Sequence, residues 1–208
     1  MNKIKMGPRG LIYPMPAFLV GTNVDSKPNF MTVAWGGIAN GEPPMISMAI
    51  RPNRYTHKGI RQSSAFSVNI PSTDMVQETD YCGIVSGIKV DKMNVCKFKV
   101  FYGKTDGAPL IEQCPVNLEC KVIHFLNLGS HSLIIGEIEE THVSESCLTD
   151  NNPDVDKIKP LIYTTGTTGQ ARQYRSLGES LGKAYYIGAK AYGVGNKGKA
   201  RAKADGIL

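Results

Sequence analysis

Residues 31–35, Met-Thr-Val-Ala-Trp, combine small side chains with Trp35, the only tryptophan in the chain. A strand that ends in small residues leaves backbone N–H and C=O groups accessible beside the indole ring. Such a surface suits a flat heterocycle with apolar faces and a hydrogen-bonding rim, and a flavin ring has both features. The alternative interpretation is that Trp35 fills the hydrophobic core.

A second segment, residues 50–58, places cationic and hydroxyl side chains where a predicted strand passes into a helix. Arg51, Arg54, Thr56 and Lys58 can each contact an oxyanion. The first turn of a helix adds free N–H groups and the positive end of the helix dipole, and together these favour a phosphate. The alternative is an exposed, charged turn.

A third segment, Ser-Gly-Ile-Lys-Val-Asp-Lys at 86–92, reads as a glycine-containing loop with two lysines. Such a loop can approach a phosphate, or the electron-rich pyrimidine edge of a reduced flavin. A cation near that edge favours the anionic reduced form. The alternative is a solvated loop.

The cysteines and histidines do not indicate a disulfide framework or a metal site. There are five cysteines, an odd number, without a CxxC pair, and the four histidines lack HExxH spacing. We therefore predict reduced cysteines and no protein-bound metal. Cys82 is the thiol of most interest, because it lies between an apparent helix and a Gly/Ser loop.

A G-x-G-x-x-G match at Gly193, Gly195 and Gly198 does not predict a dinucleotide-binding domain. That interpretation needs a preceding strand and a long following helix, whereas here a short charged segment follows.

The elements that must position these residues are mostly short strands with few helices. Proline breaks the apolar run at 11–23, so its strand is expected after Pro16, followed by a turn at 25–29. Helices are expected at 56–62 with Thr56 as N-cap, from 74 to about 81 with a capping box of Asp74 and Gln77, and at 177–189. Further strands are expected at 30–35, 45–51, 65–70, 116–127, 132–143 and 161–164, and a long loop with short pieces of structure at 83–109. The absence of βαβ alternation predicts a closed antiparallel barrel.

Length and composition favour one globular domain, because 208 residues with 41% hydrophobic content can form a single β-rich core. We expect a soluble, cytoplasmic protein, since there is no long apolar stretch and no signal peptide. Of the net charge of +6, +4 lies after residue 189. We predict a domain at 1–192 and a basic flexible tail at 193–208, either native or added for expression. A nucleic-acid surface is therefore disfavoured.

The chain resembles the flavoredoxin and flavin reductase-like, FMN-binding split-barrel family over about residues 8–192. The match rests on the order and spacing of several short motifs. They are Thr-Val-Ala-Trp at 32–35, Pro43-Pro44, Arg-Pro-Asn-Arg-Tyr-Thr at 51–56, Val-Asn-Ile at 68–70, Asp-Tyr-Cys-Gly at 80–83, Ser86-Gly87 with Asp91-Lys92, Gly-Ser-His-Ser at 129–132 and Gly-Glu-Ile at 136–138.

The resemblance implies a mainly β protein, a closed antiparallel (Greek-key) split β-barrel with a few short peripheral helices. It also implies a homodimer that binds FMN near the subunit interface. Arg51, Tyr55 and Thr56 would hold the ribityl phosphate end, with Ser86 and Lys92 supplied by the long loop. The full set of expected cofactor-binding residues is Asn29, Thr32, Val33, Ala34, Trp35, Arg51, Tyr55, Thr56, Asn69, Ser86, Lys92, His131 and Tyr163.

The implied function is an FMN-dependent oxidoreductase that passes electrons from NAD(P)H or a reductase to an acceptor. His131 is the candidate for proton transfer, because its ordinary pKa lies near neutrality. One alternative is an FMN electron carrier without a substrate of its own. Another, less favoured, is a β-barrel that binds nucleic acid.

Overall fold

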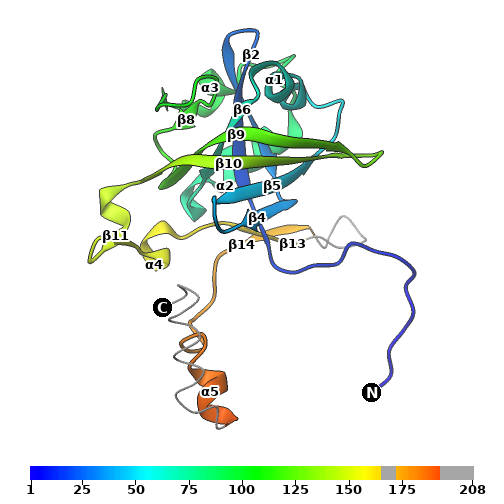
Figure 1. Cartoon of the computed structure of the whole chain (residues 1–208), viewed down its shortest axis with the longest axis vertical. Helices are drawn as coiled ribbons and strands as arrows, with labels where there is room; N and C mark the ends of the chain where they lie inside the picture. Colours follow the sequence, from blue (N-terminus) through cyan, green and yellow to red (C-terminus); the bar gives the residue numbers. More distant parts are fainter. Residues whose placement is uncertain (165–171, 193–208) are drawn as a thin grey trace. The chain divides into compact units, whose positions relative to one another are not determined.

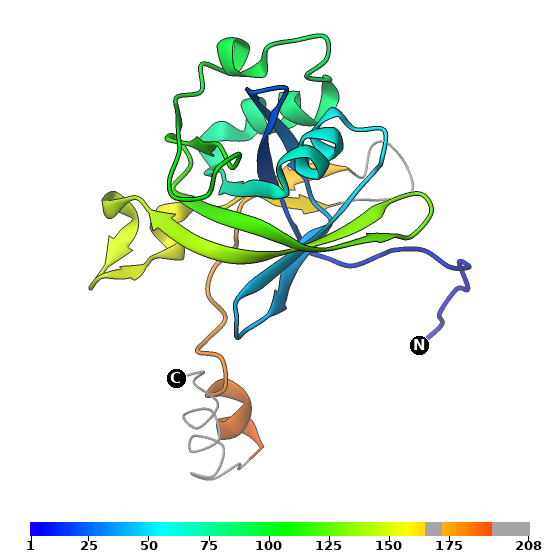
Figure 2. The same ribbon diagram turned by 45° about the horizontal axis from the view of Figure 1, so that its top comes forward.

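The computed structural model describes residues 1–164 and 172–192, and strands dominate it (Figure 1). Seven antiparallel strands form the main sheet, in the order β3-β2-β6-β9-β10-β5-β4. The strands are β2 (Phe18–Val24), β3 (Lys27–Val33), β4 (Gly36–Asn40), β5 (Met45–Ile50), β6 (Ala65–Ile70), β9 (Val116–Asn127) and β10 (Ser132–Val143). The long β9–β10 hairpin crosses the molecule in Figure 2, and the shorter β4–β5 hairpin projects beside it.

The sheet curls because its two end strands are neighbours in the sequence. Only Ala34 and Trp35 separate β3 from β4, and two residues span roughly 7 Å even when extended. The Ala49 amide also donates to the Trp35 carbonyl at 2.8 Å. The mainly β class is therefore confirmed. No hydrogen-bonded ladder joins β3 to β4 among the described strands, so closure of the barrel stays a prediction.

The curled sheet encloses an apolar core that follows the alternation of its strands. Every second residue of β5 is buried, which is the pattern of a strand with one face on a core. The core residues, drawn from six of the strands and one helix, are Phe18, Val20, Val33, Ile46, Met48, Ile50, Ile60, Phe66, Val68, Cys120 and Ile134.

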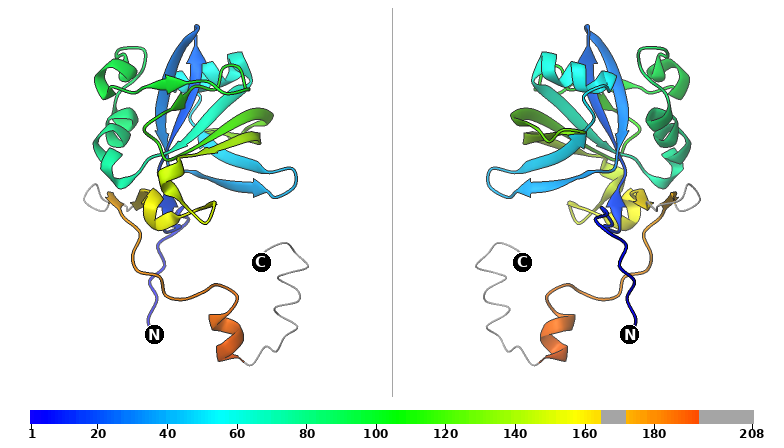
Figure 3. Two further views of the ribbon diagram at one scale, coloured as in Figure 1. Left: turned by 90° about the vertical axis from the view of Figure 1, so that its left-hand side faces the viewer. Right: turned by 90° about the vertical axis from the view of Figure 1, so that its right-hand side faces the viewer.

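Three short helices pack on this sheet (Figure 3). Helix α1 (Tyr55–Ser63) contacts β2, while α2 (Val76–Ile84) and α3 (Lys92–Cys96) contact β3. A 3-10 turn, η1 (Thr73–Met75), leads into α2. A second apolar cluster fills the space here; its members are Leu19, Phe30, Met75, Cys82, Phe98, Ile111 and Cys114. All five cysteines are free, as predicted.

Three small sheets complete the described structure. They are β1 (Met15–Pro16) with β13 (Ile162–Thr164) and β14 (Gln173–Arg175); β7 (Val100–Phe101) with β8 (Leu110–Ile111); and β11 (Leu148–Thr149) with β12 (Asn152–Pro153). The 3-10 turn η2 (Glu145–Cys147) and helix α4 (Val155–Ile158) flank the last of these.

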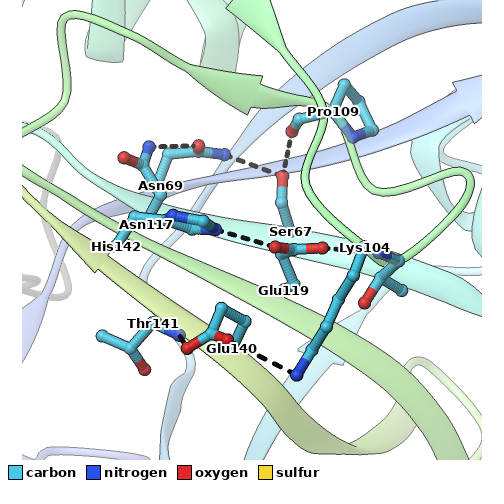
Figure 4. Close-up of polar contacts among 10 residues, drawn as sticks. Ser67, Asn69, Lys104, Pro109, Asn117, Glu119, Glu140, Thr141 and His142 are labelled. Carbon is cyan, nitrogen blue, oxygen red and sulfur yellow. Dashed lines mark hydrogen bonds and ion pairs between the residues drawn. The ribbon is translucent and has the colours of Figure 1, made fainter.

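Buried polar groups tie the main sheet to the loop before β8 (Figure 4). The Glu119 carboxylate accepts from the Thr105 amide at 2.6 Å and pairs with His142 Nε2 at 2.7 Å. Burial alone would raise the pKa of Glu119, but these hydrogen bonds outweigh it and hold the pKa below its usual value. Asn69 donates to the Leu19 carbonyl at 3.0 Å and accepts from the Ile111 amide at 2.9 Å.

The strands predicted at 65–70, 116–127 and 132–143 are confirmed to the residue. The predicted turn at 25–29 was too long, since Asp25 and Ser26 alone have positive φ and β3 begins at Lys27. Strand β4 was not predicted, because its glycine-containing sequence is exposed and has no alternation of apolar residues.

The predicted helix boundaries need correction. The N-cap of α1 is Arg54, so Thr56 lies inside the first turn. Asp74 and Gln77 form no capping box, because α2 follows η1 and its N-cap is Met75, whose side chain makes no capping hydrogen bond. The helix predicted at 177–189 is irregular until α5 (Ile187–Ala191) begins.

Contacts between residues divide the chain into two compact units, Met1–Leu177 and Gly178–Leu208. The described part of the second unit contains α5. The predicted tail at 193–208, and with it the G-x-G-x-x-G match, lies outside the described residues, so the domain boundary at 192 stays a prediction. None of the helices in the described ranges has the length and apolar character needed to span a membrane.

Candidate functional site

Two adjoining cavities lie at the corner where β3 passes into β4. The larger has a volume of about 480 Å³ and the smaller about 150 Å³. Both are lined by Met31, Arg54 and Gly83, so they form one elongated site with a wide end and a narrow end.

The wide end is lined by the segments that the sequence singled out. Thr32, Val33, Ala34 and Trp35 form one side, and the end of β5 with His131 forms the next. The rings of Trp35 and His131 are 4.9 Å apart at an interplanar angle of 33°. The Thr32 hydroxyl donates to the Thr79 carbonyl of α2, so this residue offers its backbone rather than its hydroxyl to the cavity.

His131 is electrostatically coupled to its neighbour Arg51. Partial burial, and then the Arg51 charge, lower the pKa of His131 from its ordinary 6.5, so the imidazole is neutral at pH 7. Its Nδ1 lies 2.9 Å from the Ser130 hydroxyl. A neutral imidazole at this position can accept a proton or relay one.

A further part of the wide-end lining comes from α2 and from the region of the small β1–β13–β14 sheet. Asp80, Tyr163, Arg172 and Tyr174 line it. The two tyrosine rings are 5.6 Å apart and tilted by 54°. Burial and the adjacent Asp80 carboxylate, which accepts a hydrogen bond from the Tyr174 hydroxyl, raise the pKa of Tyr174.

The narrow end is built around the N-terminus of α1. Tyr55, Thr56, Ser86 and Lys92 line it. The N-cap Arg54 makes no capping side-chain bond, and the first turn of α1 contains no acidic residue. The free N–H groups and the helix dipole therefore face this cavity without a protein anion to neutralise them.

Gly87 lets the loop approach the helix. A Cβ atom at this position would lie 2.0 Å from Asn29 Oδ1 and 3.0 Å from a ring carbon of Tyr55. Asn29 Nδ2 in turn donates to Thr56 Oγ1 at 2.7 Å. Asn29 is buried and lines neither cavity, so it positions Thr56 rather than contacting a ligand.

Lys92 is buried at the narrow end, and much of its hydrogen-bonding capacity is used by the protein. Its ammonium donates to the Phe30 carbonyl at 2.7 Å and to the Cys82 carbonyl at 2.9 Å. Burial lowers the pKa of Lys92. The same burial raises the pKa of the Cys82 thiol to about 12, so this cysteine is not a reactive thiolate.

The structure gathers most of the expected site residues, with three differences, of which the first is that buried Asn29 lines neither cavity. Arg51 lines the wide end beside His131, whereas the phosphate end had been expected for it. Asn69 lines neither cavity and belongs to the interior network of Figure 4. Sequence reasoning also missed Asp80, Arg172 and Tyr174. The period-two spacing of the last two was the available signal, but no apolar alternation marked β14.

Comparison with known proteins identifies the family. A family model described as "Flavin reductase like domain" matches residues 9–172. The chain belongs to this flavin reductase-like family.

Solved structures support the assignment. The flavin reductase-like chain is similar to a flavoredoxin from Methanosarcina acetivorans, with 39% identity, a TM-score of 0.85, and coverage of 92% of this chain and all of that one. It is equally similar in sequence to the flavoredoxin of Desulfovibrio vulgaris (Miyazaki F), with a TM-score of 0.81 and coverage of 90% and 100%. The predicted split-barrel family is thus confirmed.

A less similar curated relative has an activity in its name. The ferric-chelate reductase (NAD(P)H) of Archaeoglobus fulgidus is 28% identical over 116 residues, which cover 52% of this chain and 67% of that protein. At a general level, the flavin reductase-like chain is therefore an oxidoreductase.

The residues of this flavin reductase-like site fit a flavin nucleotide. The wide end offers the backbone of 32–35 and the Trp35 ring to a flat heterocycle. The narrow end offers an uncompensated helix N-terminus and the Thr56 and Ser86 hydroxyls to an anion. Gly87 leaves a space beside Asn29 and Tyr55 that any larger side chain would fill.

Proposed function

We propose that the chain binds FMN across the two adjoining cavities and acts, as a homodimer, as an FMN-dependent oxidoreductase. Electrons would pass from NAD(P)H or a reductase to an acceptor. The single observation that carries the proposal is the continuity of a wide end lined by aromatic residues with a narrow end at an uncapped helix N-terminus.

The residues of the chain would bind, orient and exclude water. Backbone groups at 32–35 and the Trp35 ring would hold the ring system, and Tyr55, Thr56 and Ser86 would hold the phosphate. Bound FMN supplies the redox chemistry itself. Neutral His131 would accept or release a proton at the rim of the wide end.

Substitution at the narrow end tests the cofactor. We expect purified protein to be yellow, or to become so with FMN, and Thr56→Val to weaken FMN binding about 10- to 100-fold. The reason is that a hydrogen bond to a charged group contributes about 1.5–3 kcal/mol. Quenching of FMN fluorescence measures the dissociation constant. Thr141→Val, at an exposed site on β10, is the control.

Well-folded protein that stays colourless with excess FMN would contradict the proposal. If FMN binds, anaerobic titration with NADH and NADPH separates a reductase from a carrier. A reductase is bleached directly by a nicotinamide, whereas a carrier is bleached only when a partner reductase is present.

A further inference from the structure

The wide end of the site carries more positive charge than a flavin ring requires. Among the described residues, Arg51, Arg54 and Arg172 line it, against a single lining carboxylate, Asp80, which accepts a hydrogen bond from Tyr174. Within residues 1–164 and 172–192, none of these three guanidinium groups donates a hydrogen bond to the protein or pairs with a carboxylate.

The three arginines occupy different places. Arg54 borders both cavities at the helix N-terminus and is thus available to the phosphate of a bound nucleotide. Arg51 lies near His131. Arg172 immediately precedes β14 and lines the cavity with Tyr163 and Tyr174. A nucleotide phosphate in the narrow end therefore leaves Arg172 unassigned.

Arg172 immediately precedes β14 and lines the cavity together with Tyr174 of that strand. Arg172 and Tyr174, two residues apart, both line it, whereas Gln173 and Arg175 do not. Arg175 Nη2 instead bonds Gln173 Oε1 at 2.7 Å, as expected for neighbours that share the other face. The wall thus presents two tyrosine rings and one guanidinium together.

We propose that the wide end binds, beside the flavin ring, a small planar molecule that carries a negative charge, and that Arg172 selects for that charge. The inference rests on the proposed function and names the substrate class of the same site. The rings of Tyr163 and Tyr174 suit a flat ligand, and a guanidinium can bind a carboxylate or sulfonate with two parallel hydrogen bonds.

Two isosteric probes that differ in charge test the proposal on the yellow, oxidised holoprotein. Benzoate is anionic and benzamide neutral. Trp35 lines the cavity and is the only tryptophan, so its indole N–H gives one NMR signal that reports binding. We expect benzoate to bind at least about fivefold more tightly than benzamide, the size expected for a partly exposed charge pair.

Matched variants identify the residue responsible. Arg172→Gln is expected to abolish the preference for benzoate and to leave FMN affinity unchanged, whereas Arg175→Gln, on the other face of β14, is expected to retain it. Raising the salt concentration should weaken benzoate binding and spare benzamide, because an exposed charge pair is screened. Equal affinity for the two probes, or equal behaviour of the two variants, would overturn the inference.

Competition with NAD⁺ distinguishes the two sources of such a ligand. Displacement of benzoate by NAD⁺ would show that the donor, whose negative charge lies on its pyrophosphate, overlaps the charge-selective wall, and simultaneous binding assigns the wall to the acceptor. A yellow protein without charge preference refutes this inference alone. A protein that cannot be made yellow refutes the proposed function as well.

Discussion

Gly87 illustrates how a single residue shapes the narrow end of the site. It lies where the loop passes Asn29 and Tyr55, with no room for a Cβ atom at 2.0 Å from Asn29 Oδ1. Because Asn29 also holds the Thr56 hydroxyl, a side chain at 87 would displace the group that is proposed to contact the phosphate.

We therefore expect Gly87→Ala to weaken FMN binding by about tenfold or more, since overpacking costs about 1–3 kcal/mol. Fluorescence titration with FMN measures the loss. Gly37→Ala, at a position with nothing within 4 Å of the added Cβ, should bind FMN as the unchanged protein does. Similar affinities in both variants would show that the loop moves aside.

At the scale of elements, the β9–β10 hairpin is anchored by a charge on β9 rather than by apolar packing alone. Glu119 is fully buried, and its partners come from β10 and from the loop before β8 (Figure 4). The pKa of Glu119 is lower in the folded chain than its ordinary 4.5. Its carboxylate therefore stabilises the fold above pH 4.5, and this contribution disappears as the pH falls through the folded pKa.

Glu119→Gln is expected to lower the free energy of unfolding at pH 7 by about 1.5–3 kcal/mol, the value for a hydrogen bond to a charged group. The difference from the unchanged protein should shrink as the pH is lowered below 4.5. Urea unfolding at several pH values measures both effects. Glu139→Gln, at an exposed position on β10, should change neither quantity.

At the scale of the whole molecule, the end strand β4 leaves an edge of the main sheet without a partner strand in the described residues. Ile38 on this strand is 74% exposed and the adjoining Trp35 is 52% exposed. Exposed edges with apolar side chains are usually covered in native proteins. This edge adjoins the wide end of the site, which agrees with the proposed homodimer.

We expect Ile38→Asp to shift the protein from dimer to monomer, because it would place a charge in an apolar contact between two copies. Sedimentation velocity measures the change. Val95→Asp, also at an exposed apolar position but on α3, should leave the dimer intact. A chain that is monomeric before any substitution would contradict the proposed assembly.

Local residue patterns predicted the features that depend on neighbouring residues. Strong β patterning predicted β6, β9 and β10, and the clusters at 32–35 and 51–56 marked the two ends of the site. The spacing of the cysteines also predicted that they do not form a metal site. Such signals are local, because side chains alternate along a strand and a helix begins within one turn.

The contacts between residues distant in the sequence could be found only from the folded chain. The tertiary structure placed Arg51 with His131 at the wide end and Asn69 in the interior network. It brought Arg172, just before β14, and Tyr174, within β14, to the lining of the same cavity. It also paired the exposed β4 with β5. These outcomes depend on strand pairing and burial between segments far apart in the chain, and no short stretch of sequence contains that information.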